Sequence, residues 1–237
     1  MAEIVRALQE GDVDLAVHSA KDLPAEDPDG VIVVAVPERA PPWDVLISRD
    51  GPLEAGARVG TSSLRRRGQL LRSRPFNVVD VRGNVDTRLR KMNEGAVDGL
   101  VLAQAGLARL GVVPRFAEAL PVEEMVPAPG QGALALQVRL DAEVRDVAAG
   151  IDHHPSHLEF EAERALVGRL GGGCALPLGA LAQASDGEVR LSAVVLRPDG
   201  SGTVRAESVA DAPETAAREV ADVLLAQGAA EIMQDLT

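Results

Sequence analysis

The stretch RALQEGDVDLAV at residues 6–17 returns in outline as RKMNEGAVDGLV at residues 90–101. Arginine, glutamate, glycine, valine, aspartate and a final valine recur in step. In each copy we expect a helix that ends near a glycine, Gly11 or Gly95, and then a short apolar strand, at 13–17 or 97–102. Two similar α/β units are the simplest explanation of this repeat.

The second copy has more sequence of the same kind before it. Expected strands at 58–60 and 77–81 each lead into a loop and a helix, whereas nothing precedes the helix of the first copy. We therefore expect the first unit to lack its opening strands and Met1 to be an internal or late start.

The rest of the chain divides at proline-rich segments. Residues 36–42 and 126–132 are typical of connectors, and we expect both to act as hinges. Beyond residue 151, Ser156 and Glu159 form a capping-box pattern that predicts the start of a helix. Its apolar residues share one face: Leu158, Ala162, Leu166 and Leu170.

A small α+β domain is expected to follow. Residues 189–196 alternate between apolar and polar, residues 198–201 favour a turn, and residues 203–209 complete a hairpin. An amphipathic helix over 213–233 closes the chain.

Composition excludes several classes of protein. Acidic residues outnumber basic ones 36 to 24, and the net charge of −12 argues against a general binder of nucleic acid or anionic membranes. A single cysteine excludes an internal disulfide and fits a reducing cytosol. No apolar run is long enough to span a membrane, and the first residues lack a signal-peptide pattern. The three histidines in 152–157 are typical of surface or capping residues and have no acidic or thiol partner at a recognisable ligand spacing, so we predict no metal.

A basic island interrupts this acidic chain. Nine of the 24 basic residues lie between Arg65 and Lys91, where only Asp80 and Asp86 oppose them. Guanidinium groups near helix amino-termini bind carboxylates or phosphates, so the island predicts a ligand with several anionic groups. The loop arginines Arg65, Arg66, Arg82 and Arg88 are the candidates, and Arg67, Arg72, Arg74, Arg90 and Lys91 fit a solvated helix face.

Two other positions could carry chemistry. Asp22, beside Lys21, follows the strand expected at 13–17, at the carboxyl end where open α/β sheets bind ligands. It could transfer protons or stabilise a cation, or simply cap the turn before Pro24. Cys174 follows three glycines that leave its sulfur approachable, although a lone cysteine is also a common small core residue.

Five motifs in order resemble the porphobilinogen deaminase (hydroxymethylbilane synthase) family. They are HSAKDLP at 18–24, GTSSLRR at 60–66, RGNVDTRL at 82–89, PGQGAL at 129–134 and GGGCALP at 171–177. The resemblance runs from about Glu3 to the C-terminus, without the family's N-terminal strands, mobile loop and arginine-and-serine motif. Gly172 is a minor departure.

The resemblance implies a three-domain α/β fold. Two similar domains, like type II periplasmic binding proteins, are joined by hinges, and a small C-terminal α+β domain carries the cysteine. On this sequence the domains fall at 1–37 with 133–150, at 43–126 and at 155–237, the first being incomplete.

The activity implied is that of a transferase. Four porphobilinogens condense head to tail, and each loses ammonia to form an electrophilic methylene-pyrrolenine. Hydrolysis then releases hydroxymethylbilane for tetrapyrrole (porphyrin, haem) biosynthesis. Asp22 would be catalytic, and a dipyrromethane cofactor would be bound to Cys174 through a thioether. The cofactor-binding positions implied are Lys21, Asp22, Ser63, Arg65, Arg66, Arg82 and Gly83. The substrate-binding positions implied are Ser19, Arg82, Arg88, Arg109 and Gln131.

The expected partners are porphobilinogen and the growing polypyrrole chain, without nucleic acid or membrane, for a cytoplasmic monomer. The runner-up is a truncated, inactive homologue or a non-enzymatic anion-binding protein, which would not need Cys174. A transcriptional regulator with a similar core is disfavoured by the acidic charge and the lack of a helix-turn-helix segment.

Overall fold

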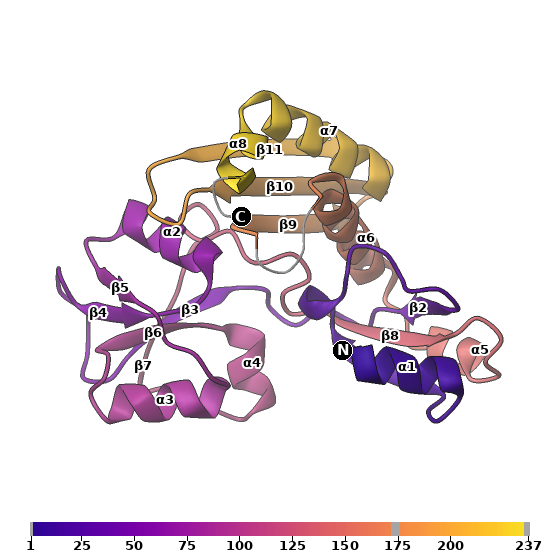
Figure 1. The fold of residues 1–237 in the computed structure, drawn as a ribbon, viewed down its shortest axis with the longest axis horizontal. Coiled ribbons are helices and arrows are strands. Elements are labelled where there is room, and N and C mark those ends of the chain that lie inside the picture. The colour runs from indigo at the N-terminus through magenta and orange to yellow at the C-terminus, as the bar shows by residue number, and fades with distance from the viewer. Residues whose placement is uncertain (1, 172–175, 235–237) are drawn as a thin grey trace.

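A computed structural model describes residues 2–171 and 176–234, and within these ranges the chain forms three sheets, each packed with helices (Figure 1). The first and second sheets lie side by side, and the third lies across them. The fold is α/β with an α+β third part, as predicted. No helix in the described part of the chain is both long and apolar enough to cross a membrane.

The first sheet has the order β1-β8-β2, and its middle strand comes from far along the chain. Both pairings are antiparallel. Its strands are β1 (Leu15–Ser19), β2 (Val31–Ala35) and β8 (Leu134–Arg139). Its helices are α1 (Ala2–Glu10), the 3₁₀ turn η1 (Ala20–Asp22) and α5 (Arg145–Ala149).

The second sheet has the order β5-β4-β6-β3-β7 and is continuous in sequence. Its strands are β3 (Asp44–Ser48), β4 (Arg58–Gly60), β5 (Asn77–Val79), β6 (Gly99–Ala103) and β7 (Phe116–Ala119). β4 pairs in parallel with both β5 and β6, whereas β3 is antiparallel to β6 and β7. Its helices are α2 (Leu64–Ser73), α3 (Val85–Asn93) and α4 (Gln104–Arg109).

The internal repeat folds the same way in both units. α1 and α3 are each followed within two residues by a glycine, Gly11 and Gly95, whose φ is +82° in each case. The next residue bonds back to the carbonyl oxygen five positions earlier, at 2.9 Å in the first copy and 3.0 Å in the second, which closes a Schellman motif. β1 and β6 follow. The predicted helix–glycine–strand pattern is confirmed in both copies, with the strands starting two residues later than expected.

The third sheet, β9 (Leu178–Ser185), β10 (Glu188–Leu196) and β11 (Thr203–Ala210), is an antiparallel meander. It contains the predicted hairpin. Helix α6 (His154–Arg169) packs Ala162 and Leu166 into the core beneath this sheet, and Leu170, which follows the helix, joins them, also as predicted.

Two details of this third part differ from prediction. The capping box is wrong: α6 already begins at His154, and the Ser156 hydroxyl accepts a hydrogen bond from the backbone N–H of Arg39 at 3.0 Å. The last helix is also broken, into α7 (Pro213–Ala226) and α8 (Ala229–Gln234), because Gly228 adopts φ +95° between them.

The predicted connectors are confirmed as irregular segments. Residues 36–43 lead from β2 to β3, and residues 125–133 lead back to β8 without helix or strand. The two connectors touch, since the backbone N–H of Ala40 donates to the carbonyl oxygen of Gly132 at 3.3 Å. The chain therefore passes between the first two sheets twice, at one place.

Candidate functional site

A cavity of about 120 Å³ lies where the three sheets meet. One part of its wall is polar and cationic, with Lys21, Ser63, Arg65 and Arg164. The rest is apolar and includes Leu23, Phe160, Val167, Leu176 and Leu178. A cavity with this lining suits a ligand that has flat apolar rings and anionic substituents.

Local structure explains why these cations converge. Lys21 lies in η1 directly after β1, and Arg65 lies in the first turn of α2, after β4 and the N-cap residue Ser63. The turn at Gly130 closes against η1: a Cβ on Gly130 would lie 2.6 Å from the backbone nitrogen of Lys21, and its φ is +70°. Only glycine fits this close approach without strain.

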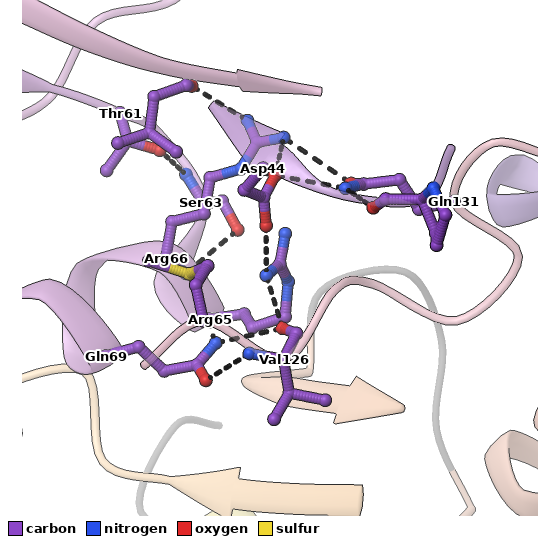
Figure 2. Close-up of polar contacts among 11 residues, drawn as sticks. Asp44, Thr61, Ser63, Arg65, Arg66, Gln69, Val126 and Gln131 are labelled. Atoms are coloured by element: carbon purple, nitrogen blue, oxygen red, sulfur yellow. Dashed lines mark hydrogen bonds and ion pairs between the residues drawn. The ribbon is translucent and has the colours of Figure 1, made fainter. Parts of the chain in front are cut away.

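Behind the cavity wall, one buried carboxylate binds two arginines (Figure 2). Asp44, the first residue of β3, is fully buried. Its Oδ2 accepts from Arg65 Nη1 at 2.7 Å, and its Oδ1 accepts from Arg66 Nε and Nη2 at 3.0 and 2.7 Å. Burial alone would raise the pKa of Asp44, but Arg65 and Arg66 outweigh it and hold that pKa below its usual range.

The same cluster reaches both connectors. Gln131 donates from Nε2 to Asp44 Oδ1 at 3.0 Å and to the carbonyl oxygen of Pro42 at 2.6 Å. Gln69, one turn further along α2, exchanges two hydrogen bonds with the backbone of Val126. The arginines of α2 are thus tied to both crossings of the chain.

Lys21 is the cavity's titratable cation. Burial of its ammonium lowers the pKa of Lys21, and the positive charge of nearby Arg66 lowers it further. An anionic ligand in the cavity would raise the pKa of Lys21 again.

A separate ion-pair network attaches α6 to the first unit. Arg39 in the first connector donates to both oxygens of the fully buried Glu163, at 2.8 and 3.1 Å. Glu163 also accepts from the backbone N–H groups of Gly130 and Ala182. Arg164 binds Asp27 through two nitrogens, at 3.2 and 3.0 Å. These contacts fix the apolar wall formed by α6 relative to η1.

The sequence comparisons identify the family to which this arrangement belongs. Residues 1–146 match the family model described as porphobilinogen deaminase, dipyromethane cofactor binding domain, and residues 157–226 match the porphobilinogen deaminase C-terminal domain. The chain belongs to the porphobilinogen deaminase family. It is 50% identical to the porphobilinogen deaminase of Desulforudis audaxviator, over 98% of this chain and 77% of that protein.

Other members of the porphobilinogen deaminase family are similarly close. The Rubrobacter xylanophilus protein is 47% identical over 98% of this chain and 77% of its own length, and the Thermus thermophilus protein is 46% identical over 99% and 81%. Among solved structures, an ancestral cationic amino acid solute binding protein aligns with a TM-score of 0.42 and 14% identity, covering 63% of this chain and 66% of that one.

Some of the predicted site residues meet at the cavity and others do not. Lys21, Ser63 and Arg65 line it, and Asp22 ends η1 next to Lys21. Ser19 ends β1, half-buried. Arg66 and Gln131 lie behind the wall in the Asp44 cluster.

The remaining predicted residues lie further along the second unit. Arg82 is 83% exposed and pairs with Asp80 at 2.9 Å. Arg88 donates from Nε to the carbonyl oxygen of Gly83 at 2.7 Å, and burial followed by the charge of Arg66 lowers its pKa. Arg109 donates to the carbonyl oxygen of Gly132 at 2.8 Å.

Cys174 lies outside the described residues. The cavity next to its neighbours nevertheless fits a dipyrromethane, because Leu176 and Leu178 belong to the apolar wall and face a lining that also holds Lys21, Ser63 and Arg65. Two pyrrole rings with carboxylate side chains require this combination of apolar surface and cations.

Sequence reasoning missed Asp44, Arg39 and Glu163. Asp44 comes from outside the window in which only Asp80 and Asp86 were seen to oppose the basic island. The only local signal was an aspartate inside an otherwise apolar run, WDVLI at 43–47. A charged residue is costly to bury unless it is paired, so an aspartate in such a run indicates a cationic partner.

Proposed function

We propose that this chain catalyses the porphobilinogen deaminase reaction, the head-to-tail condensation of four porphobilinogens to hydroxymethylbilane with release of ammonia. The observation that carries the proposal is the cavity at the meeting point of the three sheets, where Lys21, Ser63 and Arg65 face an apolar wall. Porphobilinogen and its oligomers combine apolar rings with acetate and propionate groups, and they match both sides of that lining. Membership of the family supports this reading, and no comparison supports the inactive or purely anion-binding alternative.

The dipyrromethane cofactor would be held by Lys21, Ser63 and Arg65 and attached to Cys174. When bound, it supplies the terminal pyrrole to which new units are added. We propose that Arg82 and Gly83 complete the cofactor site, with Arg66 supporting it from behind the wall. We propose that Ser19, Arg82, Arg88 and Arg109 bind the substrate's carboxylates, with Gln131 acting indirectly through Asp44.

Asp22 is the proposed catalytic residue. Asp22 is the last residue of η1, beside Lys21 and after the carboxyl end of β1. Condensation places positive charge on pyrrole nitrogens and moves protons, and a fixed carboxylate lowers the free energy of both changes. Asp22→Asn would keep the shape of the side chain and remove this charge. We expect it to lower kcat at least a hundredfold, in line with the contribution of a general acid–base group.

The deciding experiment is the intact mass of the purified protein, alongside Cys174→Ser. An added mass equal to one dipyrromethane, absent from the serine variant, together with porphobilinogen consumption, supports the proposal. An unmodified Cys174 after incubation with porphobilinogen would reject it for this chain.

The finer organisation is also part of the proposal. We place the domains at 1–37 with 133–150, at 43–126 and at 155–237, and we expect a cytoplasmic monomer. Light scattering should give the mass of a single 24.8 kDa chain.

A further inference from the structure

The two neighbouring arginines of α2 are held differently by Asp44. Arg66 directs both Nε and Nη2 at Asp44 Oδ1, and its Nη1 donates to the carbonyl oxygen of Val101 at 3.1 Å. The Nε–Nη2 edge is the fork with which a guanidinium binds a carboxylate through two parallel hydrogen bonds. In Arg66 this edge is already hydrogen-bonded to Asp44.

Arg65 has the opposite arrangement. Only its Nη1 is hydrogen-bonded within the described part of the chain, to Asp44 Oδ2 at 2.7 Å and to the carbonyl oxygen of Val126 at 2.6 Å. Its side chain lines the cavity. Its Nε–Nη2 fork therefore remains for a carboxylate that enters the cavity.

We infer that Asp44 is a positioning residue for ligand carboxylates: it anchors on Arg66 and holds Arg65 so that the free fork of Arg65 faces the cavity. This inference rests on the proposed function, since the carboxylates concerned are those of porphobilinogen and its oligomers.

Electrostatics explains why an anchor is needed. Arg65 and Arg66 are both buried, and without an anion between them their charges would repel across a medium of low dielectric. Gln131 fixes the carboxylate in turn, through its bond to Asp44 Oδ1 and a second bond to Pro42. Asp44 therefore has a fixed orientation, and its hydrogen bond to Arg65 fixes the orientation of that guanidinium as well.

A double-mutant cycle tests the inference. Porphobilinogen affinity is measured by calorimetry in the Cys174→Ser background, where no condensation follows, for Asp44→Asn, Arg65→Lys and the pair. We expect each single change to weaken binding about tenfold, the loss of one charge-assisted hydrogen bond, and the pair to be little worse than either alone. Non-additivity of this size marks residues that act as one unit.

Two further variants control for stability. Asp44→Glu keeps the buried charge but displaces it by one methylene, so it should fold and still weaken binding several-fold. If Asp44→Asn fails to fold, the affinity of Asp44→Glu alone tests whether Asp44 positions Arg65. Glu124→Gln weakens the ion pair of Glu124 with Arg74, the residue that follows α2, at 2.6 Å and away from the cavity, and should leave the affinity unchanged.

Additive effects of Asp44→Asn and Arg65→Lys, or unchanged affinity in a folded Asp44→Glu protein, would overturn the inference. Absence of turnover and of a covalent adduct in the unmodified chain would instead count against the proposed function. Because binding is measured without condensation, the two failures are separate results.

Discussion

The two α/β units carry the same sequence pattern but place it in different surroundings. Val101 in β6 is 0% exposed, whereas Val17, its equivalent in β1, is 56% exposed. Val97 and Val13 differ in the same way, at 1% and 39%. β6 lies between β4 and β3, and α2 supplies Leu70 to the cluster that buries Val101. Within the described residues β1 pairs with β8 alone. Local sequence thus determines the helix, the turn and the strand, and neighbours determine which face is buried.

The largest difference in stability between the two units is expected at the valine pair, Val101 and Val17. Val101→Lys would place an unpaired ammonium in a closed core and should lower the free energy of unfolding by about 4 kcal/mol or more. Val17→Lys leaves the charge in water and should change it by less than about 0.5 kcal/mol. Urea unfolding followed by circular dichroism measures both. Equal losses would show that β1 is buried in solution.

The next effect concerns how each unit is attached to the third sheet. The first unit uses the buried Arg39–Glu163 pair, while the second uses close packing of α2, where a Cβ on Gly68 would lie 2.5 Å from the carbonyl oxygen of Arg197. Glu163→Gln should cost about 3 kcal/mol, because it leaves Arg39 buried without its charge partner.

Gly68→Ala is the matched change on the other side. It should cost about 1–3 kcal/mol through overpacking. Thermal unfolding measures both losses. A loss below about 0.5 kcal/mol in Gly68→Ala would show that α2 does not pack closely against the third sheet.

A smaller pair of changes tests the part that both units share. Gly11→Ala and Gly95→Ala each force an L-residue into φ +82°, and each should cost about 1–2 kcal/mol. The costs should agree closely because the Schellman turn is local. A difference larger than about 1 kcal/mol would mean that Arg49, whose Nη1 lies 2.9 Å from a Cβ at Gly95, resists the substitution.

The smallest expected effect is a pH dependence that belongs to the first unit. That unit contributes Lys21 to the cavity and the second contributes Arg65, which stays charged. Since the pKa of Lys21 is lowered, its ammonium is lost at a lower pH than in a free lysine, and carboxylate binding should weaken as the pH rises through that value. The dissociation constant of porphobilinogen, measured by calorimetry in the Cys174→Ser background from pH 7 to 10, should rise several-fold with Lys21 present and stay level in Lys21→Arg. A rise of the same size in both proteins would assign the titration to another group.

Whether a structural feature could be predicted from the sequence depends on how far apart its interacting residues lie in the chain. The two helix–glycine–strand units, the hairpin and the apolar face of α6 depend on residues close in sequence, and all were predicted. The capping box failed because Ser156 binds Arg39, a residue far away in the chain. For the same reason the partner of Arg65 and Arg66 was missed. Periodicity carries no information about which distant carboxylate enters a core, and the break between α7 and α8 depended on a single glycine.

The double crossing between the first two sheets has a consequence for synthesis on the ribosome. All five strands of the second sheet lie between Asp44 and Ala119, so that sheet is complete once this stretch has emerged. β8, the middle strand of the first sheet, is made only afterwards, and until then β1 and β2 have no partner between them. Closing so long a loop is slow. We therefore expect the region nearest the N-terminus to acquire its structure after the region that follows it, with β1 and β2 open to chaperones in the meantime.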